Sequence, residues 1–123
     1  GSYQTHALAL MLTLADVEFY AGIRGPETRG DASHAPLQDS DFSGLPPTYA
    51  VAAECDPLAD DALAYGAAIV AAGGQASAQT EAGLVHGYLR ARHMSDRAAA
   101  SFARICATLS AFARSEWPFK ETQ

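Results

Sequence analysis

The pattern of apolar and polar positions predicts a helix near the start of the chain, followed by a long irregular segment. Residues Thr5–Tyr20 are apolar at most positions and contain neither Gly nor Pro, which is typical of a helix. Because apolar side chains cover most of its faces, we expect this helix to be buried on several sides or to form a lid over an apolar site. Gly, Pro, Asp and Ser then dominate residues 24–47, which indicates an irregular connection.

A strand–helix–strand unit follows this connection. Residues Thr48–Glu54 are short, β-rich at their start and largely apolar, as expected of a strand covered on both faces. Pro57 opens an alanine-rich helix that Gly73-Gly74 ends, and Ala76–Glu81 is predicted as a second, more polar strand. Two strands joined in this way run parallel, so their carboxyl ends meet at one edge of a sheet. A last helix is predicted from about Ser95, with apolar side chains at three- and four-residue spacing, ending by Pro118.

An acid and a histidine follow the two predicted strands. Asp56 comes directly after the first strand, and His86 lies 30 residues later in a predicted loop, Gly83–Gly87. Open α/β sheets bind ligands beyond the carboxyl ends of their strands, so the two side chains are expected to meet there. An acid and a histidine held together are two of the three groups of a hydrolytic triad. Taken alone, however, an acid such as Asp56 is more often a helix cap than a catalyst, and His86 could equally be a turn residue.

Composition and charge narrow the class of protein. With 123 residues, 49% of them hydrophobic, the chain is long enough for one compact domain and is not expected to be disordered. A net charge of −6 without a basic run argues against a nucleic-acid partner. The longest apolar stretch, Ala7–Ala15, is too short to span a bilayer.

The two cysteines indicate a redox compartment, and the first two residues indicate how the chain begins. Cys55 and Cys106 are too few for a disulfide framework, so we expect buried free thiols and a cytoplasmic location. Gly1 and Ser2 resemble the remainder of a cleaved expression tag. Two alternatives stay open: Ser2 could belong to the natural sequence, and a targeting signal could have been removed when the tag was added.

The remaining charged and titratable residues have structural interpretations. Asp60 and Asp61 fall in the first turn of a predicted helix, where they complement the helix dipole. Glu54 is expected to be solvated or paired. The other histidines show no metal-ligand spacing with one another or with the acids, so we predict no metal site and no cofactor. These histidines are His6, His34 and His93.

Three stretches of the sequence carry a family resemblance. They are Asp41–Thr48, which leads into the first predicted strand, Cys55–Asp61 (CDPLADD) and Gly83–Tyr88 (GLVHGY). Together they resemble the carboxyl-terminal part of an α/β-hydrolase, and more narrowly the bacterial carboxylesterases of the hormone-sensitive lipase family. The resemblance extends from Tyr3 to Phe112, with Ala59 in place of the arginine usual in the family's Asp-Pro-Leu-Arg-Asp motif.

The resemblance implies a fold, a division of the chain and site residues. The fold would be the carboxyl-terminal portion of an α/β-hydrolase, with about two parallel core strands, flanking helices and a lid helix. Residues 1–30 would contribute to the lid, and residues 31–123 to the core. Asp56 would be the triad acid and His86 the triad base, while Leu84, Val85 and Phe19 would line the substrate pocket.

The same resemblance implies that part of the enzyme lies elsewhere. In this fold the triad follows the order serine, acid, histidine, with the serine on a Gly-x-Ser-x-Gly elbow. No serine before Asp56 lies in such an elbow, and the His-Gly-Gly oxyanion loop is absent too. We therefore expect a serine-bearing amino-terminal portion as partner, short- to medium-chain acyl esters as substrates, and no activity from this chain alone. Whether the protein forms a homo-oligomer stays open. The alternative to an esterase portion is a non-catalytic fragment or binding module of hydrolase-derived fold.

Overall fold

The computed structural model describes residues 1–25 and 30–119, which form two compact units. The first unit is Gly1–His86 and the second is Gly87–Gln123. The helices and strands of the first unit, in chain order, are α1 (Ser2–Thr5), α2 (Leu14–Ile23), the 3-10 helix η2 (Pro36–Gln38), β1 (Thr48–Cys55), α3 (Ala59–Ala71) and β2 (Ala76–Val85).

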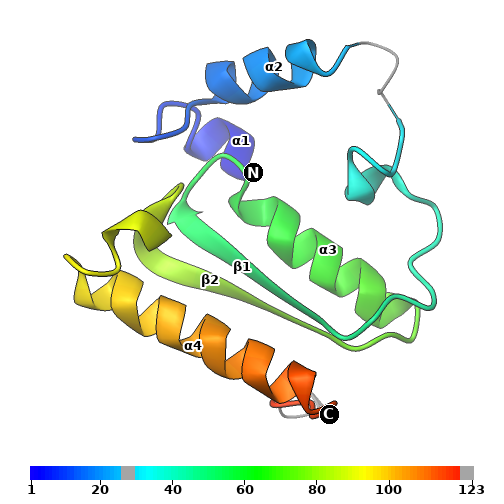
Figure 1. The fold of residues 1–123 in the computed structure, drawn as a ribbon. Helices are drawn as coiled ribbons and strands as arrows, with labels where there is room; N and C mark the ends of the chain where they lie inside the picture. The colour runs from blue at the N-terminus through cyan, green and yellow to red at the C-terminus, as the bar shows by residue number, and fades with distance from the viewer. Residues whose placement is uncertain (26–29, 120–123) are drawn as a thin grey trace. The chain divides into compact units, whose positions relative to one another are not determined.

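The centre of the first unit is the predicted strand–helix–strand motif. β1 and β2 form a parallel two-stranded sheet, and α3 crosses over between them along one face, as Figure 1 shows. Gly66 faces the sheet at close range, because a Cβ atom at this position would lie 3.0 Å from the Cβ of Ala78. The small side chains of α3 therefore allow the close packing that the sequence predicts.

The pairing of β1 with β2 is regular along most of its length and then shifts. Thr48 pairs with Ala76, and the same offset of 28 residues persists to Ala53 opposite Glu81. Cys55 instead pairs with Val85, so β2 contains two extra residues over this interval. β2 thus ends at Val85, and the prediction that the strand stops at Glu81 and a loop begins at Gly83 was wrong.

The predicted helix Thr5–Tyr20 is wrong as a single element, because two helices replace it. α1 ends at Thr5, and the chain then turns through Met11, whose φ of 74° is incompatible with a continuing helix. Thr13 restarts the helix through a capping box with Asp16: each side chain bonds the backbone N–H of the other residue. No residue of α2 is buried within the described chain, in contrast to the expected burial on several sides.

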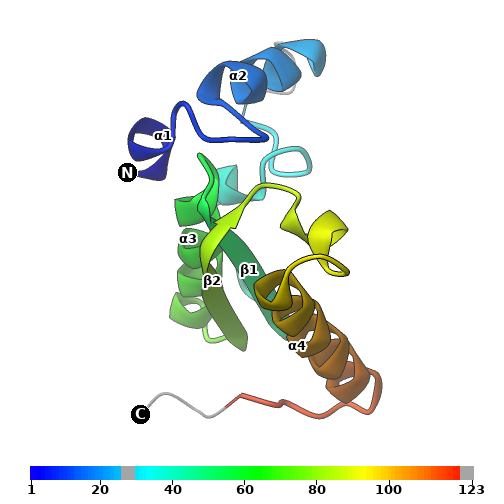
Figure 2. The ribbon, with the colours of Figure 1, turned by 90° about the vertical axis from the view of Figure 1, so that its left-hand side faces the viewer.

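The helices α1 and α2 lie beyond the carboxyl ends of the two strands. Figures 1 and 2 both show this arrangement within the first unit, with α3 alongside the sheet. The predicted irregular connection is confirmed for its described part, in which η2 is the one short helical turn; its residues 26–29 lie outside the described residues.

The second unit contains the 3-10 helix η3 (Tyr88–Ala91) and the helix α4 (Asp96–Ala113). The predicted start of the last helix is confirmed, since the Ser95 side chain caps α4 by accepting the N–H of Ala98. The helix ends five residues before Pro118, because Ser115 adopts a left-handed φ of 58°. The ring of Trp117 then stacks on Phe112 with centroids 5.9 Å apart.

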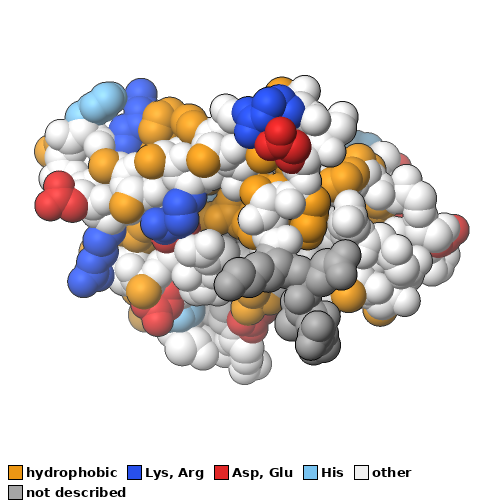
Figure 3. Space-filling view, turned by 90° about the horizontal axis from the view of Figure 1, so that it is seen from below, with side chains coloured by type: hydrophobic (Ala, Val, Ile, Leu, Met, Phe, Trp, Pro, Cys, Tyr) orange, Lys and Arg blue, Asp and Glu red, His pale blue; other side chains and the backbone are white. Residues whose placement is uncertain are grey.

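The described residues also bear on three expectations from sequence: membrane spans, the cysteines and the distribution of charge. No helix in residues 1–25 and 30–119 is long and apolar enough to cross a membrane. Both cysteines are free thiols as predicted, but neither is buried: Cys55 is half-buried and Cys106 exposed. On the face drawn in Figure 3, basic side chains lie interspersed with acidic and apolar ones.

Candidate active site

Asp56 and His86 meet at the carboxyl ends of the two strands. Asp56 directly follows β1, and its side chain is only 8% exposed. One carboxylate oxygen, Oδ1, accepts the N–H of Leu58 at 2.9 Å, and the other, Oδ2, lies 2.8 Å from Nδ1 of His86. His86 follows β2 directly and is about half exposed. The structure thus brings together the acid and the histidine that the sequence analysis singled out.

This contact fixes the orientation of the imidazole. A carboxylate only accepts hydrogen bonds, so an ionised Asp56 requires the proton of a neutral His86 to sit on Nδ1. The Nε2 atom then carries a lone pair and can take a proton from a hydroxyl group. The hydrogen bond from Leu58 leaves the carboxylate little freedom to rotate, so the aim of the imidazole is set by the first turn before α3.

A second Asp–His pair in the chain lacks these properties. Asp31 and His34 lie 3.2 Å apart within a single turn, and both side chains are nearly half exposed. Hydrogen bonds from the side chain and backbone of Ser33, the largest causes, lower the pKa of Asp31. Because this pair is local and solvated, its orientation is not enforced by secondary structure, unlike that of Asp56 and His86.

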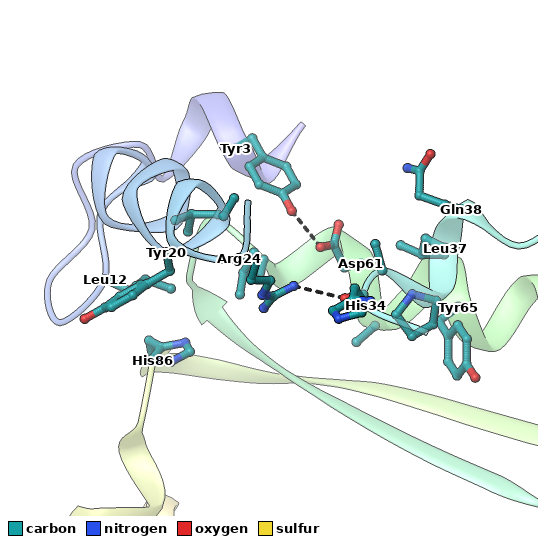
Figure 4. A pocket seen from close by; sticks show the side chains of 16 residues that line it. Tyr3, Leu12, Tyr20, Arg24, His34, Leu37, Gln38, Asp61, Tyr65 and His86 are labelled. Atoms are coloured by element: carbon teal, nitrogen blue, oxygen red, sulfur yellow. Dashed lines mark hydrogen bonds between the residues drawn. The ribbon is translucent and has the colours of Figure 1, made fainter. Parts of the chain in front are cut away.

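A broad, open pocket of about 930 Å³ adjoins His86. Figure 4 shows His86 at one end of this pocket and Tyr65 at the other, with Arg24 between them. The apolar wall comes partly from α2, whose lining residues follow the three- and four-residue spacing of one helix face. These residues are Val17, Tyr20 and Ala21 of α2, together with Arg24 directly after it.

The three residues predicted to line a substrate pocket are not among those that line this one. Phe19 lies on another face of α2 and is 66% exposed. Leu84 is buried and Val85 half-buried within the end of β2. Sequence reasoning missed the lining residues of α2 because the apolar side chains around this segment do not distinguish the face that lines the pocket from the others.

The two acids after Asp56 hold α1 against the start of α3. The Ser2 hydroxyl donates to the carbonyl of Pro57 at 2.6 Å and accepts the N–H of Asp60 at 3.1 Å. The carboxylate of Asp60 in turn accepts the N–H of Ser2 at 2.7 Å. Ser2 is buried, and it caps α3 from a distant part of the chain because the N-cap residue, Leu58, offers no side-chain bond. Ser2 therefore takes part in the hydrogen bonds that hold the start of α3.

Asp61 makes the second contact, with the hydroxyl of Tyr3. The phenol donates to the Asp61 carboxylate at 2.7 Å, as the dashed line in Figure 4 shows. Partial burial, followed by this hydrogen bond, raises the pKa of Tyr3 to about 12. The acids assigned to the helix dipole from sequence thus also bind the segment that leads into α2.

Replacing Ser2 by alanine is expected to lower the free energy of unfolding by about 1–2 kcal/mol, because α3 loses its cap and the carbonyl of Pro57 loses a buried donor. Thr5→Ala is the matched control, since the Thr5 hydroxyl lies on the same short helix, is exposed and bonds only Gly1. Urea unfolding of the folded protein measures both variants. Equal stabilities of the two variants would contradict the tertiary cap.

The rest of a hydrolytic site is not found among residues 1–25 and 30–119. Within these ranges no serine hydroxyl is hydrogen-bonded to His86, whose recorded bond is to Asp56. The same part of the chain holds no group of three or more His, Cys, Asp or Glu side chains arranged to bind a metal ion.

The geometry agrees with what comparison with known proteins finds. A family model described as "alpha/beta hydrolase fold" matches residues 2–90. The chain belongs to the α/β-hydrolases. The predicted fold class, a partial α/β-hydrolase with two parallel strands and flanking helices, is thereby confirmed, as is the resemblance to the carboxylesterases of the hormone-sensitive lipase family.

Individual relatives of this α/β-hydrolase chain are esterases. Carboxylesterase NlhH of Mycobacterium tuberculosis is 43% identical over 51 residues, which cover 42% of this chain and 16% of that protein. The esterase of Pyrobaculum calidifontis matches with a TM-score of 0.81 at 25% identity, over 91% of this chain and 38% of its own. EstE1, a thermostable carboxylesterase cloned from a metagenomic library, matches with a TM-score of 0.74 at 31% identity, over 89% and 38%. The chain thus spans less than two fifths of each of these proteins.

Proposed function

We propose that this chain is the acid- and histidine-bearing portion of a serine carboxylesterase that hydrolyses short- to medium-chain acyl esters. The observation that carries the proposal is the 2.8 Å contact between Asp56 and His86 at the end of an open, largely apolar pocket. The kinship with carboxylesterases supports the choice of ester chemistry over other acyl transfers.

The two residues would act in both halves of an acyl transfer. In the first half, Nε2 of His86 removes the proton of a serine hydroxyl as the serine oxygen attacks the ester carbonyl, and then gives that proton to the leaving alcohol. In the second half, Nε2 takes a proton from water as the water attacks the acyl-serine, and returns it to the serine oxygen as the acid leaves. Asp56 keeps Nδ1 protonated and stabilises the imidazolium that forms in each half.

The proposal requires a serine and an oxyanion loop from an amino-terminal portion that is not part of this sequence. Two features of the structure support such a partner. The sheet described has only two strands, so β1 pairs on one side alone among the described residues. Large apolar side chains before and within α2 are exposed, as a surface that packs against further protein would be. They are Leu8, Leu10, Met11, Phe19 and Ile23.

The rival proposal, a non-catalytic module of hydrolase-derived fold, differs in what it needs to fold. A module would melt cooperatively as a monomer by itself. A portion of a larger domain would aggregate, lack a cooperative transition or require its partner, because of the exposed strand edge and apolar side chains. Thermal unfolding of the 123-residue chain separates the two proposals.

The decisive experiment joins a serine-bearing amino-terminal portion of an α/β-hydrolase to the chain ahead of Gly1; we call the product the complemented protein. Hydrolysis of p-nitrophenyl acetate and butyrate is expected from the complemented protein and not from the 123-residue chain. A folded complemented protein without turnover on either ester would overturn the proposed function.

A further inference from the structure

We propose that Glu54 and Gly83 are positioning residues that bring His86, which directly follows β2, level with Asp56 so that the two side chains meet. The proposal rests on the proposed function for its catalytic consequence, but its structural claim concerns the Asp56–His86 contact alone. From sequence, Glu54 is expected only to be solvated or paired, and Gly83 to lie in a loop.

The shift in strand register decides which residue stands opposite Asp56. With the offset of 28 residues that holds up to Ala53 and Glu81, Asp56 would be level with Leu84. With the offset of 30 that holds for Cys55 and Val85, Asp56 is level with His86. Two strand residues span about 7 Å, so without the two extra residues His86 would lie beyond hydrogen-bonding reach of Asp56.

One hydrogen bond and one unusual backbone conformation lie at the shift. The Glu54 carboxylate accepts the N–H of Gly83 at 2.6 Å, a short bond of the charge-assisted kind. Gly83 has a φ of +69°, a conformation that a residue with a Cβ atom adopts only with strain. Glu54 stands on β1 between Ala53 and Cys55, where the register changes. The glycine thus permits the bulge, and the glutamate binds it to the neighbouring strand.

The bulge adds little to the stability of the two-stranded sheet. The strands already pair regularly over six positions, and a bulge leaves ladder groups unpaired and bends the strand. Its effect falls on the residues that follow, and the first of these beyond β2 is His86. The role of this bulge is therefore to bring the His86 side chain level with Asp56.

The test measures the Asp56–His86 contact directly. The proton on Nδ1 of His86 is observed by 15N-edited NMR in histidine-labelled protein and assigned by its absence in His86→Gln. The sample is the complemented protein, or the 123-residue chain where that melts cooperatively by itself. We expect Glu54→Ala and Gly83→Ala to lose this protected signal and, in the complemented protein, to lower kcat about 100-fold with KM unchanged.

Matched variants separate positioning from general damage. Gly44→Ala introduces a Cβ atom at an identical φ of +69° in open space, and Glu116→Ala removes an exposed carboxylate from the second unit. Both are expected to keep the signal and kcat. Glu54→Gln should restore both partly, because its amide oxygen still accepts the N–H of Gly83. Far-UV circular dichroism establishes that each variant is folded, and Glu54→Asp, one methylene too short for the contact, replaces Glu54→Ala if that variant unfolds.

The outcomes separate this proposal from the proposed function. A folded Glu54→Ala or Glu54→Asp variant that keeps both the Nδ1 proton signal and kcat overturns the positioning role, even where the enzyme is active. Loss of the signal in these variants, together with a folded, unsubstituted complemented protein that hydrolyses no ester, supports the positioning role and overturns the proposed function.

Discussion

Replacing His86 by alanine is expected to lower kcat of the complemented protein by about 10⁶, the effect of removing a triad histidine that no other group can replace. Nε2 of His86 is the one atom in the proposed site that accepts and returns the proton at every step. KM should change little, because the imidazole forms one end of a broad pocket. Initial rates of p-nitrophenyl butyrate hydrolysis over a range of substrate concentrations give both constants.

The control for this prediction is another histidine of the same chain. His93→Ala removes an exposed imidazole in the second unit and should leave kcat within a factor of two or so, since surface substitutions have small effects. Retention of more than a hundredth of the original kcat by a folded His86→Ala variant would remove His86 from the mechanism.

Replacing Asp56 by asparagine is expected to lower kcat by about 10⁴ while leaving the fold intact. The asparagine oxygen can still accept the N–H of Leu58, so the turn that leads into α3 keeps this hydrogen bond. The amide NH₂ group must then face Nδ1 of His86. Because that group only donates, the imidazole has to present its lone pair at Nδ1 and carry its proton on Nε2. In this tautomer His86 cannot accept the proton of the serine.

This variant also separates the two interpretations of Asp56 that the sequence left open. If Asp56 were only a helix cap, Asp56→Asn would keep both stability and activity, because asparagine caps helices as well as aspartate does. The triad role predicts unchanged urea unfolding together with the loss of turnover. Asp31→Asn is the control, since it alters the exposed Asp–His pair in the same way. Activity of Asp56→Asn within tenfold of the unsubstituted protein would contradict the triad role.

The two predicted strands and the helix between them were found because local signals are strong there. Short apolar runs and the Gly73-Gly74 pair mark where β1, α3 and β2 lie along the chain, and the crossover helix makes the strands parallel. The division into a lid segment at residues 1–30 and a core at 31–123, and the roles of Leu84, Val85 and Phe19 as substrate contacts, stay predictions.

The first helix was misjudged because its local signals conflict. Apolar composition favours a continuous helix from Thr5, whereas the Thr13–Asp16 capping box and the left-handed Met11 divide it. The capping box is visible in the sequence as Thr-x-x-Asp, and giving it more weight would have placed the start of α2 correctly.

The sequence by itself determined that an acid and a histidine would follow two neighbouring parallel strands, because connectivity and hydrophobic pattern are local properties. Tertiary structure decided whether the two side chains meet, since that depends on a two-residue change of register bound by Glu54 and Gly83. It also decided that Ser2 caps α3, a contact between residues more than 50 positions apart. Neither the register change nor the Ser2 cap produces a periodic pattern in the sequence. Each depends on the distance between atoms of separate segments once the sheet has formed.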